Sequence, residues 1–251
     1  MWNNVQYNYS GANVLVTGGT GGLGYAIADA FARAGAAVTI TGTKPSPTEY
    51  DKDLGRFDYL QLDVENNAHV EAVGARFERL DVIVHSAGVA FYVLGLDEFE
   101  PDNFERAIKM HLTSVYRLSE NCSQALKRSI LPGGASVIHI AAMTSFFGME
   151  PVPAYGSAKT GLLGLTRVLA VRWARDNIRV NAIACGMVES GMTKPMMDQP
   201  EVSNQLLARV PMGRHGQPDD ISGAALFLAS DAASWITGQA FPVDGGFSIA
   251  G

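Results

Sequence analysis

The segment NVLVTGGTGGLG at residues 13–24 joins a short β-branched run to a turn with five glycines in seven residues, 18–24. Because glycine has no Cβ, the backbone N–H groups of such a turn can approach a phosphate closely. The pattern that follows predicts a helix over about residues 23–34, and its positive N-terminal end would point to the same place. A strand, a glycine-rich turn and a helix in this order favour a site for a dinucleotide pyrophosphate, although glycine also serves purely structural turns.

Short β-branched runs alternate with helical patterns along the whole chain. The runs predict strands at 13–17, 37–41, 59–62, 81–85, 136–140, 179–183 and 240–243. Helices are predicted near 23–34, 66–78, 101–130, 154–175 and 218–229. Runs of Val and Ile with little alternation are typical of strands buried on both faces. The sequence therefore predicts an α/β fold, a doubly wound parallel sheet of about seven strands with helices on both faces.

Two residues indicate where predicted helices end or begin, and two prolines disfavour a helix in one segment. Gly35 follows the first helical pattern as a C′ glycine would, and Pro218 opens the last as an N1 proline would. Pro45 and Pro47 make a full helix within residues 42–58 doubtful.

Composition narrows the class of protein. The 251 residues suit a single domain over 1–251, and 47% hydrophobic with 18% charged residues suits a buried core. A net charge of −6 without a basic cluster argues against nucleic-acid or membrane partners. Cys122 and Cys185 lack metal-ligand spacing, so no metal site is expected, and free buried thiols are favoured over a disulfide. With no signal-like or membrane-spanning run, we expect a soluble, cytoplasmic protein.

A second motif carries acid–base chemistry. Tyr155 and Lys159 are four residues apart in a helical pattern, so both side chains would project from one face. A nearby ammonium favours the phenolate and would lower the tyrosine pKa from its usual value of about 10. Such a pair could donate or take a proton near neutral pH, although a surface Tyr/Lys pair would give the same pattern.

Taken together, the motifs resemble those of the short-chain dehydrogenase/reductase family along nearly the whole chain. They are Thr17-Gly18-x-x-x-Gly22-x-Gly24, Asp63-Val64, Ser86-Ala87-Gly88, Tyr155-x-x-x-Lys159, Asn181–Gly186 and Val243–Gly246. Residues 140–148 and the length look closest to sugar-acid and polyol dehydrogenases and to 3-oxoacyl reductases. The resemblance implies a Rossmann domain, a homotetramer, and reversible hydride transfer between NAD(P) and a small-molecule alcohol or carbonyl substrate.

The resemblance also implies a role for individual residues. Tyr155 would be the general acid/base, and Lys159 would lower its pKa and hold the nicotinamide ribose. The remaining cofactor contacts fall after successive strands. They are Gly18, Thr20, Gly21, Leu23 and Gly24 at the phosphates, Asp63 and Val64 at the adenine, Ser86, Ala87 and Gly88 after the fourth strand, and Gly186, Val188 and Ser190 at the carboxamide.

The chain departs from the family pattern at its catalytic positions. The family serine thirteen residues before the tyrosine is Ala142 here, and alanine cannot hydrogen-bond a substrate carbonyl. Thr144 or Ser145 could replace it, and Thr144 is favoured because it shares the parity of Ala142 if the backbone stays extended. The helix asparagine that supports a proton-relay water is His111, which either preserves the relay or is simply buried. His85 and Cys185 are milder departures, in turns where backbone contacts dominate.

The end of the second strand bears on the choice of cofactor. It reads Thr41-Gly42-Thr43-Lys44, without the carboxylate that binds the ribose 2′-hydroxyl in NAD-selective sites. Thr43 could donate to a 2′-phosphate and Lys44 could neutralise it, which favours NADP(H). Gly21 occupies a place where many NADP-using relatives carry a basic residue, and Lys44 could be a solvated loop charge, so NAD(H) stays open.

Apolar and thioether side chains follow the fourth, fifth and sixth predicted strands. Residues 187–215 resemble the substrate lid of the family and contain Met187, Met192, Met196 and Met197. These groups indicate either an apolar pocket for a hydrophobic ketone or alcohol, or packing in a lid or oligomer interface. Two functions remain open: a carbonyl/alcohol oxidoreductase, or a cofactor-binding sensor or assembly subunit with little turnover, which Ala142 would favour.

Overall fold

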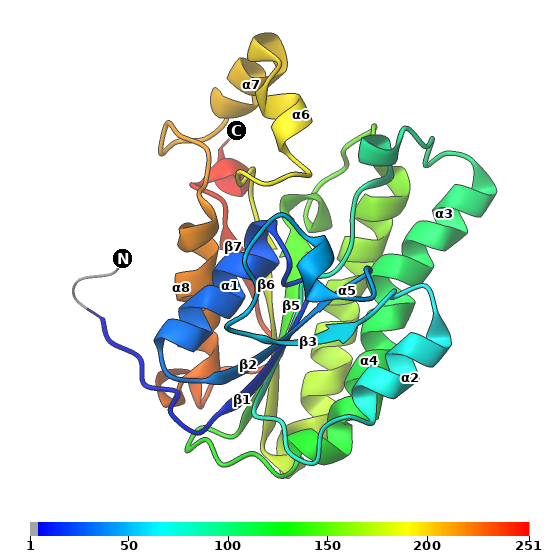
Figure 1. Cartoon of the computed structure of the whole chain (residues 1–251). Coiled ribbons are helices and arrows are strands. Elements are labelled where there is room, and N and C mark those ends of the chain that lie inside the picture. The colour runs from blue at the N-terminus through cyan, green and yellow to red at the C-terminus, as the bar shows by residue number, and fades with distance from the viewer. Residues whose placement is uncertain (1–4, 251) are drawn as a thin grey trace.

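The computed structural model describes residues 5–250 and contains one seven-stranded parallel sheet with the order β3-β2-β1-β4-β5-β6-β7 (Figure 1). In sequence order the strands are β1 (Asn13–Thr17), β2 (Ala37–Gly42), β3 (Asp58–Gln61), β4 (Val82–His85), β5 (Ala135–Ala142), β6 (Ile178–Cys185) and β7 (Ala240–Val243). The predicted fold class and the seven strands are confirmed. The strand order reverses beside β1, and the crevice there is where open α/β sheets bind ligands.

Helices cover both faces of the sheet. They are α1 (Gly22–Arg33), α2 (Asn67–Gly74), α3 (Pro101–Ile108), α4 (Ser114–Leu126), α5 (Pro153–Trp173), α6 (Lys194–Met197), α7 (Pro200–Leu207) and α8 (Pro218–Ala229). Side chains of α1 and α8 pack into one apolar core, and those of α2, α4 and α5 pack into a second core across the sheet. The predicted helix ends at Gly35, with φ +92°, and at Pro218, at N1, are confirmed.

Two details of the helices go beyond the sequence prediction. The helical pattern predicted near 101–130 is confirmed over residues 101–126, where α3, a π-helical turn over Lys109–Thr113 and α4 follow one another directly. The π-turn inserts an extra residue into the helical hydrogen-bond ladder, which apolar periodicity does not reveal. Residues 187–215, the segment that resembles the substrate lid of the family, contain two short helices, α6 and α7, which stand above the carboxyl edge of the sheet (Figure 1). Within residues 42–58 the structure has one 3-10 turn, Pro47–Glu49, and no longer helix.

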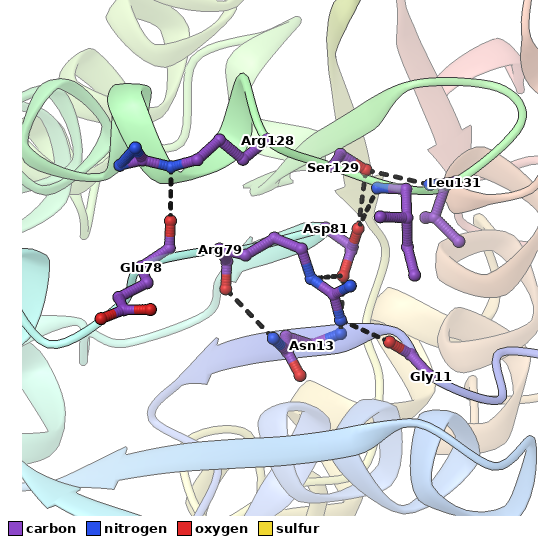
Figure 2. A network of polar contacts seen from close by, with 9 residues as sticks. Gly11, Asn13, Glu78, Arg79, Asp81, Arg128, Ser129 and Leu131 are labelled. Atoms are coloured by element: carbon purple, nitrogen blue, oxygen red, sulfur yellow. Dashed lines mark hydrogen bonds and ion pairs between the residues drawn. The ribbon is translucent and has the colours of Figure 1, made fainter.

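A polar network fixes the amino edge of the sheet (Figure 2). The Asp81 carboxylate, just before β4, is fully buried. It accepts the backbone N–H groups of Asn13 and Ile130, each at 2.8 Å, and the Ser129 hydroxyl, also at 2.8 Å. Arg79 Nε lies 3.5 Å from the same carboxylate. One side chain therefore connects the start of β1 to the segment between α4 and β5.

Both cysteines are buried and free, as expected. In the described part of the chain, no helix is long and apolar enough to cross a membrane.

Candidate active site

The turn between β1 and α1 is a close-packed backbone cradle. Gly18 has φ +68°, and a Cβ there would come within 2.9 Å of the Ala87 Cα. The Thr17 hydroxyl accepts the N–H groups of Ser86 and Ala87 at 3.0 and 3.1 Å, which holds the turn after β4 against this one. The N-cap residue of helix α1 is Gly21, which offers no side-chain cap, and the first turn of the helix has no acidic residue. These features fit the phosphates of a dinucleotide cofactor, which would meet unblocked N–H groups and a favourable helix dipole.

A cleft of about 450 Å³ extends from this cradle over the carboxyl ends of β4, β5 and β6. Most of the residues predicted for the cofactor and for proton transfer line it together. They are Gly18, Thr20, Gly21, Leu23, Gly24, Ser86, Ala87, Gly88, His111, Tyr155, Lys159, Gly186, Val188 and Ser190.

Tyr155 and Lys159 lie one turn apart near the start of α5. The Lys159 ammonium donates a hydrogen bond to the Ile140 carbonyl at 2.7 Å, which fixes it under the end of β5. It lies 5.5 Å from the centre of the Tyr155 ring. Both side chains face the cleft, so the structure brings the predicted acid–base pair to the predicted cofactor cradle.

The pKa values of this pair differ from the sequence expectation. Burial raises the pKa of the Tyr155 phenol, and the nearby Cys185, Tyr92 and Glu98 raise it further. Burial also lowers the pKa of Lys159 to about 8. The expected lowering of the tyrosine pKa is therefore wrong for the chain without cofactor, because desolvation disfavours the charged phenolate. At neutral pH the phenol carries its proton.

His111 lies in the π-turn, and its ring meets the Tyr155 ring edge-on at 5.0 Å between centres. Burial, with a further contribution from Lys159, lowers the pKa of His111 to about 3, so the expected titration near neutrality is wrong. Its Nε2 lies 3.1 Å from the Val89 carbonyl. Because a carbonyl only accepts, Nε2 carries the proton, and Nδ1 is left without a protein partner. A Cβ on Gly88 would reach within 2.6 Å of Nδ1, so glycine makes room for this ring.

The structure separates the two candidates for the missing hydroxyl from the cleft. Ala142, at the end of β5, lines the cleft with Tyr155. Thr144 and Ser145 lie in a 3-10 turn over Met143–Ser145 and line a different hollow, beside Phe99 and Phe146. Their hydroxyls are buried without a protein partner. The extended backbone on which the choice of Thr144 depended is absent, so the parity argument does not apply there.

Four of the predicted cofactor residues lie outside the residues that line the cleft: Thr43, Lys44, Asp63 and Val64. Lys44 is exposed just beyond β2, where its backbone N–H donates to the Tyr50 hydroxyl at 3.0 Å and its ammonium contacts the Glu49 carbonyl. Asp63 accepts the Glu65 N–H at 2.9 Å in a local turn.

The thioether side chains divide between two roles. Met192 lines the cleft, whereas Met196 and Met197 pack around a buried cluster that includes Met143, Val210 and Phe247. Of the two interpretations of the methionines, lid packing therefore accounts for the last pair.

Sequence reasoning missed two contributors to the site. The Ile140 carbonyl holds Lys159, and the buried Glu98 carboxylate accepts the Tyr155 N–H at 2.8 Å. Cys185, which the sequence analysis noted only as a departure from the family pattern, also lines the cleft. A backbone carbonyl and a loop glutamate 57 residues from Tyr155 leave no local pattern.

Comparison with known proteins agrees with this geometry. A family model described as enoyl-(acyl carrier protein) reductase matches residues 18–248. A 3α-hydroxysteroid dehydrogenase of Mediterraneibacter gnavus is 32% identical over 92% of this chain and 94% of its own length. A 2-dehydro-3-deoxy-D-gluconate 5-dehydrogenase of Bacillus subtilis is 35% identical over 96% of each chain. The crystal structure of a gluconate 5-dehydrogenase from Burkholderia cenocepacia, in complex with NADP and tartrate, superposes with a TM-score of 0.86 at 28% identity and 98% coverage of both chains.

The chain belongs to the short-chain dehydrogenase/reductase family. It is an NAD(P)-dependent oxidoreductase of the class that acts on CH–OH groups.

Proposed function

We propose that this protein interconverts a small-molecule ketone and a secondary alcohol with NADP(H), and that Tyr155 is its general acid/base. The observation that carries the proposal is the placement of Tyr155 and Lys159 on one turn of α5, facing the cleft that begins at the glycine cradle. Bound NADP(H) would supply or accept the hydride.

Three side chains of the cleft would transfer the proton, bind the ribose and hold a relay water. The Tyr155 phenol, protonated at neutral pH, donates its proton to the carbonyl oxygen during reduction and recovers one during oxidation. Lys159 uses one N–H on the Ile140 carbonyl, which leaves two for the ribose hydroxyls and for polarising the phenol. Neutral His111 packs against the Tyr155 ring, and its Nδ1 can accept from a relay water.

The preference for NADP(H) rests on the end of β2. Thr43 and Lys44 follow Gly42 there, without a carboxylate to bind a ribose 2′-hydroxyl. The Burkholderia relative was solved with NADP. Asp63 and Val64 would lie along the adenine. NAD(H) is the alternative, and equilibrium titration with NADPH and NADH decides: a clear NADH preference contradicts the roles of Thr43 and Lys44.

The substrate is a carbonyl or alcohol compound with an apolar part. Val93, Ala142 and Met192 line the cleft alongside Tyr155. The helices α6 and α7 stand above the carboxyl edge of the sheet (Figure 1). The relatives named above act on a steroid and on a sugar acid, so the panel of trial substrates should include both hydrophobic and polyhydroxy compounds.

The direct test measures NADPH oxidation with a ketone panel and NADP⁺ reduction with an alcohol panel. We expect turnover that depends on Tyr155. Cofactor binding without turnover on any compound would contradict the proposal.

That outcome would instead support a second candidate, a cofactor-binding sensor or assembly subunit. It is favoured by one observation: a methyl group at Ala142 faces the cleft, and the nearby hydroxyls of Thr144 and Ser145 line another hollow.

We also propose that four copies assemble, as is usual in the family. In support, Tyr116 on α4 and Val168 and Val171 on α5 are exposed, the last with 81% of its surface accessible. A glutamate on α4, Glu120, contacts Arg172 of α5 at 3.3 Å, so the two helices are neighbours. Light scattering at micromolar concentration tests this, and a monomer would contradict it.

A further inference from the structure

Glu98 is a buried carboxylate that lies beside the catalytic helix but outside the cleft. Only 2% of its surface is exposed, and it takes part in no ion pair among residues 5–250. Its Oε2 accepts the Tyr155 N–H at 2.8 Å, and its Oε1 accepts the Phe91 N–H at 3.0 Å. A buried charge is costly unless such bonds compensate it, so both contacts are integral to the fold.

The contact with Tyr155 replaces a local helix cap. Helix α5 begins with Pro153 at N1, which has no N–H, and its N-cap residue Val152 has no side-chain acceptor. The N–H of Tyr155, at N3, would normally be satisfied by an N-cap side chain. Glu98 supplies that acceptor from another element, and its negative charge complements the helix dipole.

The contact with Phe91 connects the same carboxylate to the wall of the cleft. Phe91 opens the 3-10 turn Phe91–Leu94 after β4. In that turn the Tyr92 hydroxyl donates to the Met192 carbonyl of the lid segment at 2.8 Å, and the Ala90 N–H meets the Met192 sulfur at 3.4 Å. A short series of bonds therefore runs from the lid through this turn and Glu98 to Tyr155.

We propose that Glu98 is a positioning residue for catalysis. It caps α5 and thereby fixes the position of the Tyr155 hydroxyl relative to the turn Phe91–Leu94, which contacts the lid segment. The inference rests on the proposed function. It also predicts an electrostatic effect, because the Glu98 charge is one of the groups that raise the pKa of Tyr155.

The test compares Glu98→Gln, Glu98→Asp and the matched control Asp81→Asn. The amide of Glu98→Gln can accept only one of the two N–H groups, and its NH₂ opposes the other. We expect Glu98→Gln to lose about 10- to 100-fold in turnover, with little change in cofactor Kd, since a small displacement of a reacting group suffices for such a loss. Glu98→Asp keeps the charge and should recover part of the turnover.

Two further readouts separate positioning from general destabilisation. In Glu98→Gln, removal of the charge should shift the pH profile of alcohol oxidation to lower pH, whereas Glu98→Asp keeps the wild-type profile. Amide hydrogen exchange across residues 152–159 should become faster in Glu98→Gln. Asp81→Asn removes an equally buried carboxylate at the amino edge, so it should lower thermal stability and leave both readouts unchanged.

Each outcome decides one question. Unchanged exchange at 152–159 in Glu98→Gln contradicts the role of Glu98, whether or not any substrate is turned over. Equal losses of turnover in Glu98→Gln and Asp81→Asn also contradict it. Wild-type protein without turnover on the whole panel contradicts the proposed function, while faster exchange in Glu98→Gln would still establish the cap.

Discussion

Asp81 and Glu98 are both buried carboxylates that accept two backbone N–H groups, and they lie at opposite edges of the same sheet. At the amino edge, Asp81 joins β1 to the segment before β5, far from the cleft (Figure 2). At the carboxyl edge, Glu98 joins the cleft wall to the catalytic helix. A buried carboxylate therefore stabilises the fold at the amino edge, and a second one positions Tyr155 at the carboxyl edge.

The edges also differ in how completely their polar atoms are paired. The Asp81 oxygens have three hydrogen-bond donors between them, besides Arg79. Around the carboxyl ends of the strands, His111 Nδ1 and the Thr144 and Ser145 hydroxyls are buried without protein partners. Unpaired buried groups cost stability, and such groups concentrate where a protein binds ligands. Mutations at the two edges should therefore separate stability from activity.

The largest effect is expected for Tyr155→Phe. Loss of the phenol removes the only proton donor assigned to the substrate oxygen, and turnover should fall by about 10²–10⁴-fold. The fold and cofactor affinity should be retained, because the side chain makes no hydrogen bond to the rest of the described protein. Tyr92→Phe is the comparison: it removes a phenol from the neighbouring turn and breaks its bond to the Met192 carbonyl, but it keeps the Tyr155 phenol, so its loss of turnover should be much smaller. If the two variants lose equal activity, Tyr155 is not the acid/base.

Asp81→Ala should lower stability and leave turnover unchanged, which is the reverse of the effect of Tyr155→Phe. It leaves the N–H groups of Asn13 and Ile130 without their acceptor, at a cost in unfolding free energy of about 2–5 kcal/mol. Denaturant titration measures the loss, and turnover per folded molecule should stay at the wild-type value. A fall in turnover without loss of stability would contradict the division between the edges.

Ala142→Ser restores a hydroxyl at the end of β5, in the cleft beside Tyr155. One donor to a developing oxyanion is worth about 10²–10³ in rate when fully aligned, so we expect a gain of up to about 10²-fold. Thr144→Val serves as the control, because Thr144 lines the other hollow, and it should leave turnover unchanged. If turnover falls in Thr144→Val, this hydroxyl reaches the substrate and the missing donor has been replaced.

Lys159→Met tests the cost of the buried ammonium. In the folded chain the pKa of Lys159 is lowered from 10.5 to about 8, so between these values the unfolded chain binds more protons and wild-type stability rises with pH. At pH 7 the variant should be more stable than wild type by about 1–3 kcal/mol, although inactive. The difference should vanish near pH 10.5. Lys194→Met removes an exposed lysine whose pKa is raised by the hydrogen bond to Asp198, so it should not be more stable than wild type at pH 7. A constant difference for Lys159→Met would contradict the shifted pKa.

The fold and the location of the cleft could be predicted from the sequence where the structure depends on residues that are close together in the chain. Short apolar runs, most of them rich in Val and Ile, placed all seven strands, and the glycine turn with Tyr155 and Lys159 located the cleft. It was least informative where a tertiary contact decides the outcome. The π-turn at His111, the 3-10 turn at Thr144 and the desolvation that raises the Tyr155 pKa all depend on neighbours distant in the chain.

The cap on α5 has a consequence for the order of folding. Because the acceptor for the Tyr155 N–H comes from Glu98, 57 residues earlier, the first turn of α5 cannot be completed by its own sequence. We expect a refolding chain to protect the amides of β1 and β4 before those at 152–156, so that native-like secondary structure appears before enzymatic competence.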